Sequence, residues 1–309
     1  MLVAGIDAGG SKTECIIYNN KENKILAKVV TGPANYQVVG IDKACQEIKL
    51  AIDEAKKVAD INKIPLLGIG MAGVGRKNDK KRLKKKLSKL LEVENFYLSD
   101  DGYIALLGAT GGENGIVVIA GTGSIAYALK KSGEKIRSGG WGPLIGDEGS
   151  GFWIGIEAIK RAVRAEEKRE NNTLLVKLIK EHFSFNELQE IIPFIYDNNL
   201  PRKEIARLAP WVFELAQKGD ILAKELVKKA VSELSLLVSS LRERLDYKEN
   251  KIAVSGGLFN SDFFYDSLKK YLKEEHLLQI YKAEYSAAFG AVFYALQENK
   301  GRIKWVKKL

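Results

Sequence analysis

Two glycine-rich turns with the same flanking pattern constrain this chain most. One turn is Gly9–Lys12, and the other, more than a hundred residues later, is Gly121–Gly123. A strand-length apolar run precedes each turn and another follows it, so each turn closes a β-hairpin and does not open a helix. Glycines in a tight turn let consecutive backbone N–H groups approach a polyanion, because no Cβ stands in the way. Each hairpin is therefore predicted to bind phosphate.

Other phosphate-binding motifs fit the sequence less well. A Walker P-loop needs a GK[ST] tripeptide that opens a helix, and the sequence contains none. Gly121–Ala126 and Gly68–Gly73 both match the GxGxx[GA] string of dinucleotide-binding folds. The first match is followed by strand-like residues, and the second has no acidic residue at the expected distance. Both matches are weak.

The order of predicted elements repeats along the chain. In the first half the pattern predicts a meander of three strands at 2–7, 13–18 and 25–30, followed by a helix at 41–58 and a strand at 66–71. A lysine-rich helix after 76, a strand at 96–99 and a short helix through 104–107 complete this half. The second half begins the same order at strands 116–120, 124–129 and 135–137, and ends with strands 252–255 and near 278–281 and a final helix. The prediction is an α/β fold of two βββαβαβα domains that face each other across a cleft.

The predicted domain boundaries follow from this repeat. The first domain is 1–114, with the C-terminal helix 284–309 as a candidate to complete it. The second is 115–283, and it carries a helical insertion at 148–247, where the sequence reads as nearly all helix.

Composition excludes several classes of function. The net charge is +10, but much of the excess lies on one face of the basic helix, which has a leucine stripe and no interleaved aromatic residues, so no nucleic-acid partner is expected. The apolar runs are strand-length, so we expect a cytoplasmic protein with no membrane partner. Cys15 and Cys45 are the only cysteines, and they are expected in the core. His182 and His276 lie away from every glycine motif.

Three segments resemble one family of ATPases. They are GIDAGGSKTE at 5–14, VIAGTGS at 118–124 and GGWGPLIGDEGSG at 139–151. These segments are similar to the actin-like ATPase superfamily and, within it, to the BadF/BadG/BcrA/BcrD ATPase family, which includes N-acetylglucosamine kinases; archaeal-type broad-specificity hexokinases share the motifs. The resemblance covers nearly the whole chain and implies actin-like, ribonuclease H-like domains.

The resemblance implies a set of sugar-binding residues. Asp101 is the expected catalytic residue, since a carboxylate can orient a sugar hydroxyl and accept its proton; Asp100 is the second candidate. The other expected sugar-binding residues are Asn35, Gly140, Trp141 and Asp147. Two alternatives stay open: Asp147 begins the next helix, or Trp141 packs in the core.

ATP and Mg²⁺ are the expected cofactors. Asp7 follows the first strand beside the phosphate turn, so it is expected to hold Mg²⁺, through water. The expected ATP-binding residues are Gly9, Gly10, Ser11, Lys12, Thr13, Gly121, Thr122, Gly123, Ser124, Gly256, Gly257 and Ser261, together with Ala216 facing adenine.

The expected function is an ATP-dependent kinase that phosphorylates the 6-hydroxyl of a hexose or amino sugar: N-acetylglucosamine, glucosamine, glucose or mannose. Gln37 stands where some N-acetylglucosamine kinases have an aromatic residue, which leaves the requirement for the acetyl group open. The alternative is an ATPase activator of a 2-hydroxyacyl-CoA dehydratase or benzoyl-CoA reductase, but that branch of the family needs iron–sulfur cysteines that this chain lacks. The expected partners are ATP and the sugar, and relatives suggest a homodimer.

Overall fold

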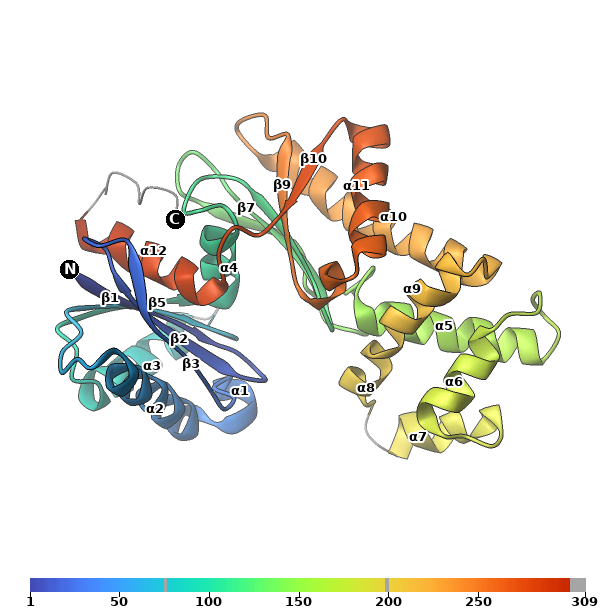
Figure 1. The fold of residues 1–309 in the computed structure, drawn as a ribbon, viewed down its shortest axis with the longest axis horizontal. Helices are drawn as coiled ribbons and strands as arrows, with labels where there is room; N and C mark the ends of the chain where they lie inside the picture. The colour runs from blue at the N-terminus through green and yellow to red at the C-terminus, as the bar shows by residue number, and fades with distance from the viewer. Residues whose placement is uncertain (75–76, 198–199, 301–309) are drawn as a thin grey trace. The chain divides into compact units, whose positions relative to one another are not determined.

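The chain forms two compact units. The computed structural model describes residues 1–74, 77–197 and 200–300. Unit 1 contains Met1–Asn114 and the chain from Ala283 onward, and unit 2 contains Gly115–Lys282. Each unit is built on a five-stranded mixed sheet with helices packed against it (Figure 1). The α/β fold class predicted from the sequence, with one sheet in each half of the chain, is confirmed.

Unit 1 has strand order β3-β2-β1-β4-β5. The β1–β2 and β2–β3 pairs are antiparallel, and the β1–β4 and β4–β5 pairs are parallel. Its elements are β1 (Leu2–Ala8), β2 (Thr13–Asn19), β3 (Lys24–Thr31), α1 (Tyr36–Val39), α2 (Ile41–Ala59), β4 (Leu66–Met71), α3 (Lys77–Leu90), β5 (Asn95–Asp100), α4 (Asp101–Ala109) and α12 (Ala287–Lys300). Of the predicted helix 284–309, residues 284–286 precede α12 and are not helical, and residues 301–309 lie outside the described residues.

Alternation along the strands divides the core of unit 1 into two layers. In β1, Ala4 and Ile6 pack in the cluster that contains the buried side chains of α2, whereas Val3 packs in the cluster with α4 and α12. This pattern follows from the two-residue period of a strand, which sends successive side chains to opposite faces. The helices α2 and α12 therefore cover opposite faces of the sheet (Figure 1).

Glycines allow α12 to lie unusually close to the sheet and to α4. A Cβ on Gly5 would stand 2.1 Å from the carbonyl oxygen of Ala288, and one on Gly68 would stand 1.9 Å from that of Ala291. Within α12, a Cβ on Gly290 would stand 1.8 Å from the carbonyl oxygen of Ile104 in α4. Real side chains never approach so closely, so these three positions admit only glycine unless the backbone moves.

Unit 2 has strand order β10-β9-β6-β7-β8. The β6–β7 and β7–β8 pairs are antiparallel, and the β6–β9 and β9–β10 pairs are parallel. Its elements are β6 (Ile116–Ala120), β7 (Ser124–Leu129), β8 (Lys135–Gly139), α5 (Gly151–Glu166), α6 (Leu175–Phe183), η1 (Leu188–Glu190), α7 (Ile191–Asp197), α8 (Arg202–Ala206), α9 (Leu208–Gln217), α10 (Ile221–Arg244), β9 (Lys251–Ser255), η2 (Gly257–Asn260), α11 (Asp262–His276) and β10 (Gln279–Lys282).

The helical segment predicted between the third and fourth strands of unit 2 is present as the run from α5 to α10. These helices share one core cluster with one face of the sheet, to which Val118 of β6 and Val254 of β9 contribute. The segment 198–201, whose Asn-Asn-Leu-Pro sequence predicts a break in this helical run, falls partly outside the described residues. Among the helices that the structure describes, none has the length and apolar character needed to cross a membrane.

The close approach of α12 predicts the effect of adding one methyl group. Gly290→Ala should lower the free energy of unfolding by about 1–3 kcal/mol, because α12 must move away from α4 to accommodate the Cβ. Gly10→Ala is the matched control, since the nearest atom to a Cβ there is 3.9 Å away. Thermal and urea unfolding of both variants would test this, and equal stability of Gly290→Ala and the unchanged protein would contradict it.

Candidate functional site

The turn between β1 and β2 has exposed backbone amides that can donate hydrogen bonds to a ligand. The Gly9 amide donates to the carbonyl of Lys12 at 3.0 Å, which closes the turn. The amides of Gly10 and Ser11 donate to no protein acceptor within the described residues, and both residues are exposed. Two consecutive outward amides beside a serine hydroxyl are the arrangement that suits an anion.

The segment after β3 is tied to this turn. The carbonyl oxygen of Gly9 accepts hydrogen bonds from the amides of Ala34 at 3.0 Å and Asn35 at 3.1 Å. Asn35 caps α1, since its side-chain oxygen accepts from the amide of Gln37 at 3.0 Å. A Cβ on Gly10 would lie 3.9 Å from the side-chain nitrogen of Asn35. Unit 1 thus brings the predicted sugar residue Asn35 next to the predicted phosphate turn.

Two predicted phosphate-binding residues of this hairpin have different surroundings. Lys12 is exposed, and its ammonium group lies 3.5 Å from the Glu14 carboxylate. Thr13 is fully buried, and its hydroxyl donates to the carbonyl of Gly32 at 2.8 Å. The Thr13 hydroxyl therefore joins the hairpin to the segment after β3 and does not face outward as expected, because side chains alternate along β2.

Three aspartates lie at the carboxyl ends of the parallel strands β1 and β5. Asp7 is the last residue but one of β1, and Asp100 ends β5. The Asp100 side chain caps α4 by accepting from the amide of Tyr103 at 3.0 Å, and Asp101 is the first residue of that helix. Asp101 Oδ1 accepts instead from the amide of the next residue, Gly102, at 2.9 Å, so the two adjacent aspartates contact different amides and only Asp100 caps the helix.

Asp7 and Asp101 interact electrostatically. The pKa of Asp7 is raised to about 7, chiefly by burial and also by the nearby carboxylates of Asp101 and Glu14, against the opposing effect of Lys12. Glu14 pairs with Asp7 across the β1–β2 ladder and is itself buried. This end of the sheet therefore has an excess of negative charge, which favours a cation.

The turn between β6 and β7 in unit 2 is built in a similar way. The Gly121 amide donates to the carbonyl of Gly123 at 2.9 Å. The first amides of α5 donate to the turn: Gly151 to the carbonyl of Gly121 at 2.8 Å and Phe152 to the carbonyl of Thr122 at 3.2 Å. Thr122 is exposed, and its amide and that of Gly123 donate to no protein acceptor in the part of the chain described.

Ser124 has the same kind of surroundings as Thr13. It is 3% exposed, and its hydroxyl donates to the carbonyl of Glu148 at 2.7 Å. Its side chain was expected at the phosphates, but it instead connects the hairpin to the segment after β8. Of the four predicted hydroxyl donors, only those of Ser11 and Thr122 lie on exposed residues.

Asp147 is a buried carboxylate between two loops. Its backbone is left-handed, with φ 63°, so it does not begin a regular helix, and Ser150 is the cap of α5. A Cβ on Gly123 would lie 2.7 Å from an Asp147 carboxylate oxygen. Arg202 donates to Asp147 Oδ2 at 3.1 Å. The pKa of Asp147 is raised by burial, and Arg202 and the amides of Gly142 and Ser124 lower it.

The predicted adenosine residues differ in their exposure. Gly256 has φ 104°, and a Cβ there would lie 2.3 Å from the carbonyl oxygen of Ala120, so glycine is required. Gly257 has open space around it and lies next to the β6–β7 turn, since its nitrogen is 3.9 Å from the Cβ position of Gly121. Ser261 caps α11 by accepting from the amide of Phe264.

Ala216 does not fit its predicted role. It is 1% exposed and belongs to the core cluster of unit 2. Ala216 lies on the buried, apolar face of α9, so its methyl group is not accessible to an adenine ring.

Trp141 lies at the surface and not in the core. Its side chain is 62% exposed, and the Arg137 guanidinium lies over its ring at 4.5 Å from the centroid. Arg137 also donates to the carbonyl of Gly140 at 3.2 Å. Gly140 has φ 71°, and a Cβ there would lie 2.3 Å from Ile125 Cδ1. The loop is therefore shaped by glycine and supported by Arg137.

Sequence reasoning missed Glu14, Arg137 and Arg202. Only Glu14 had a usable signal, since a charged residue in an otherwise apolar strand, directly after a phosphate turn, is unusual. Within the described residues, no group of three or more His, Cys, Asp or Glu side chains is arranged to hold a metal ion. A cation here would keep most of its water ligands, as Mg²⁺ does.

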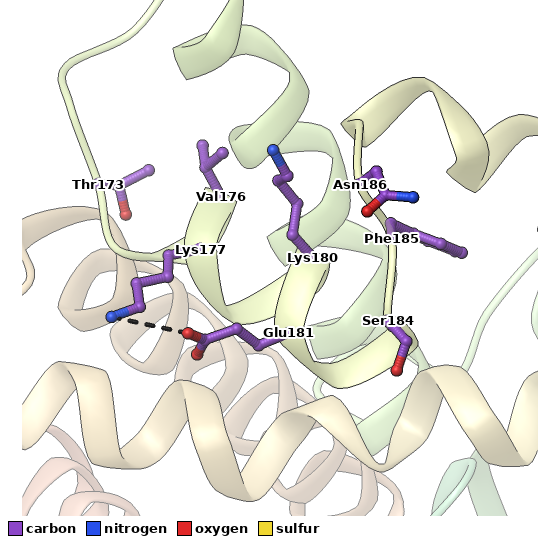
Figure 2. Close-up of a pocket in the computed structure, with 8 residues that line it drawn as sticks. All are labelled: Thr173, Val176, Lys177, Lys180, Glu181, Ser184, Phe185 and Asn186. Carbon is purple, nitrogen blue, oxygen red and sulfur yellow. Dashed lines mark ion pairs between the residues drawn. The ribbon is translucent and has the colours of Figure 1, made fainter.

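A surface hollow elsewhere in unit 2 contains none of the predicted site residues. It has a volume of about 620 Å³ and lies along α6 and the loop that follows (Figure 2). Its lining consists of Thr173, Val176, Lys177, Lys180, Glu181, Ser184, Phe185 and Asn186. Lys177 pairs with Glu181 at 3.6 Å across one side.

Comparison with known proteins identifies similar chains over nearly the full length. An N-acetylmuramic acid/N-acetylglucosamine kinase from Clostridium acetobutylicum is 35% identical over 306 residues, which cover 96% of this chain and 98% of the relative. An N-acetyl-D-glucosamine kinase from Dictyostelium discoideum is 31% identical, with 96% and 98% covered.

A crystal structure from Chromobacterium violaceum, provisionally assigned as an N-acetylglucosamine kinase, superposes with a TM-score of 0.76 at 26% identity, and the match covers 94% of this chain and 97% of that one. The model of one family matches residues 4–295. The chain therefore belongs to the BadF/BadG/BcrA/BcrD ATPase family.

Proposed function

We propose that the protein transfers the γ-phosphoryl group of ATP to the 6-hydroxyl group of an amino sugar. The observation that carries this proposal is the placement of Asp101 beside Asp7, with Asp100 and not Asp101 serving as the helix cap. Relatives named as kinases of N-acetylglucosamine, N-acetylmuramic acid and glucosamine support the sugar class. Glucose and mannose are the second class of acceptor.

In this proposal Asp101 accepts the proton of the sugar hydroxyl as that oxygen attacks the γ-phosphorus. Asn35 lies in the same unit, on the segment tied to the β1–β2 turn, and its side-chain amide is a suitable donor to a second hydroxyl. Gly140 and Trp141 in unit 2 are proposed to border the sugar.

The phosphates of ATP are proposed to bind the outward amides of the two glycine turns. The donors are the amides of Gly10, Ser11, Thr122 and Gly123, the hydroxyls of Ser11 and Thr122, and the Lys12 ammonium. Such turns favour anions because their N–H dipoles converge. Gly256 and Gly257 are proposed to lie against the nucleoside, where the open space around Gly257 leaves room for it.

Mg²⁺ fits the end of β1 because burial and two neighbouring carboxylates raise the pKa of Asp7. Asp7 is proposed to hold the ion through water, with Asp101 close by. When bound, the ion neutralises charge on the phosphates and on the departing ADP. A homodimer and a cytoplasmic location also stay predictions.

The alternative function, an ATPase activator with an iron–sulfur cluster, is weakened by the cysteines. Cys15 and Cys45 are both buried, in β2 and α2 of unit 1. Burial raises the pKa of Cys15 to about 12 and that of Cys45 to about 11. Cluster ligands are thiolates, so these two buried thiols are poor candidates.

A substrate panel tests the function. ADP release with Mg·ATP should depend on the acceptor and should be fastest with N-acetylglucosamine, glucosamine or N-acetylmuramic acid, with glucose, mannose and N-acetylmannosamine for comparison. The 6-deoxy form of the best acceptor should inhibit without turnover, because it lacks the attacking hydroxyl. ADP release at the same rate without any sugar would refute the kinase assignment.

The two adjacent aspartates allow a matched test of the catalytic residue. Asp101→Asn should lower kcat by about 100- to 10,000-fold, because an amide cannot accept the proton. Asp100→Asn should keep most activity, because asparagine also caps a helix well. Steady-state kinetics of the two variants decides between them, and the reverse result would transfer the catalytic role to Asp100.

The raised pKa of Asp7 predicts that the ionised carboxylate lowers the stability of the folded protein. A folded-state pKa of about 7, against an ordinary value of 3.8, means that this group's contribution to stability is fully present below pH 3.8 and is lost as pH rises to 7. Asp7→Asn should therefore raise the free energy of unfolding at pH 8 by up to about 4 kcal/mol and should have little effect at pH 4.

Urea unfolding in EDTA at both pH values is the measurement. Added Mg²⁺ should narrow the difference at pH 8, since an ion that binds only the folded form stabilises it. A stability difference between the variant and the unchanged protein that does not vary with pH would contradict the prediction.

A further inference from the structure

The carboxylate of Asp147 connects two loops of unit 2. It occupies the space beside Gly123 in the β6–β7 turn, and it accepts hydrogen bonds from the amides of Ser124 in that hairpin and Gly142 in the loop after β8. The residue is 5% exposed and adopts a left-handed backbone that a side chain rarely adopts without support. The phosphate turn and the predicted sugar loop therefore depend on one carboxylate.

Arg202 reaches this carboxylate from the helical insertion. It is the first residue of α8, and its Nη2 donates to Asp147 Oδ2 at 3.1 Å although the two residues are 55 positions apart. Its guanidinium also lies over the ring of Phe152 at 5.7 Å from the centroid. Phe152 in turn donates its amide to the carbonyl of Thr122 in the phosphate turn. Arg202 thus contacts two residues that lie against the β6–β7 turn, Asp147 and Phe152.

The setting of Arg202 is unfavourable on grounds of stability alone. Its Nε is buried and has no hydrogen-bond partner among the described residues. An unsatisfied buried donor costs free energy, and an ion pair whose arginine side chain is 41% exposed contributes little stability in return. A functional requirement for a cation at this position explains the arrangement better.

We propose that Arg202 is a positioning residue for phosphoryl transfer. It holds the Asp147 carboxylate against the β6–β7 turn and so fixes both the turn that receives ATP and the loop at Gly140–Gly142. Asp147 is also the predicted sugar-binding carboxylate, so the same pair would fix the position of that carboxylate for a sugar hydroxyl. This inference rests on the proposed kinase function for its activity assay, but its nucleotide-binding assay does not depend on the sugar.

The charges around Asp147 predict how the pH dependence of activity changes when the Arg202 charge is removed. Burial raises the pKa of Asp147, Arg202 and the amides of Gly142 and Ser124 lower it, and the neighbouring Glu148 raises it. Removal of the Arg202 charge raises this pKa, so a higher pH is then needed to ionise the carboxylate. The acidic limb of the activity profile should move to higher pH.

The test compares Arg202→Gln, Arg202→Lys and Arg161→Gln. Arg161 pairs with Glu225 at 2.9 Å between α5 and α10, so its variant is a matched control that breaks another ion pair of the same unit. Arg202→Gln should lower kcat/KM about 10- to 100-fold at pH 7 and shift the acidic limb of the profile to higher pH. Arg202→Lys should restore the profile, and Arg161→Gln should match the unchanged protein.

A second readout uses calorimetric binding of a non-hydrolysable ATP analogue without sugar. Arg202→Gln should bind the analogue several-fold more weakly, and this loss should disappear in the Asp147→Asn background, because the two residues act as one unit. If the unchanged protein phosphorylates no sugar, the kinase proposal fails, and this binding assay still decides the role of Arg202.

Two outcomes would overturn the inference. One is an Arg202→Gln variant that is less heat-stable but has the unchanged protein's pH profile and analogue affinity, which would make the ion pair structural only. The other is full additivity of the Arg202→Gln and Asp147→Asn effects on binding. If Arg202→Gln does not fold, Arg202→Lys with Asp147→Asn gives the same comparison.

Discussion

The amides of the two glycine turns point outward because the carbonyl groups of the same turns accept hydrogen bonds from neighbouring segments. In unit 1 the carbonyl of Gly9 accepts two amides from the segment after β3, and in unit 2 the carbonyls of Gly121 and Thr122 accept the first two amides of α5. With their carbonyls held inward, the turns present their N–H groups outward, and those groups can meet an anion without competition from a protein acceptor. The proposed phosphate chemistry of both units depends on this arrangement.

Side-chain hydrogen bonds also connect each hairpin to the segment after the third strand. Thr13 and Ser124 occupy the first position of the return strand, and each donates its hydroxyl to a carbonyl in the segment after the third strand. Asn35 and Ser150 then cap the helix that follows. The two units thus repeat a hairpin, a hydroxyl connection and a capped helix, and the repeat places residues such as Asn35 and Asp147 beside a glycine turn without a common sequence motif.

The sequence predicted the elements well because their signals are local. Apolar alternation and glycine turns located the strands to within a residue or two, and β4, β6 and β7 have the predicted bounds. The directions of individual hydroxyls were harder to predict, since Ser11 and Thr13 look alike in sequence, but Ser11 lies in the exposed turn and Thr13 begins β2, where it is buried. Ala216 was predicted to face adenine because the resemblance indicates which segment matches the family but not which face of α9 is buried. Arg202 was missed because its partner is 55 residues away and nothing in the intervening sequence signals the pair.

The glycine contacts of α12 make the folding of unit 1 depend on chain order. Gly5 and Gly68 lie in strands translated early, but Ala288 and Ala291, which they contact, are translated after the whole of unit 2. Until then one face of the unit 1 sheet, including Val3 and Leu66, has no helix α12 to cover it. These contacts of high sequence separation slow folding and leave apolar surface exposed on the nascent chain. The first unit to emerge from the ribosome is therefore the last to be completed, and a fragment that ends with unit 2 would contain one finished domain and one open sheet.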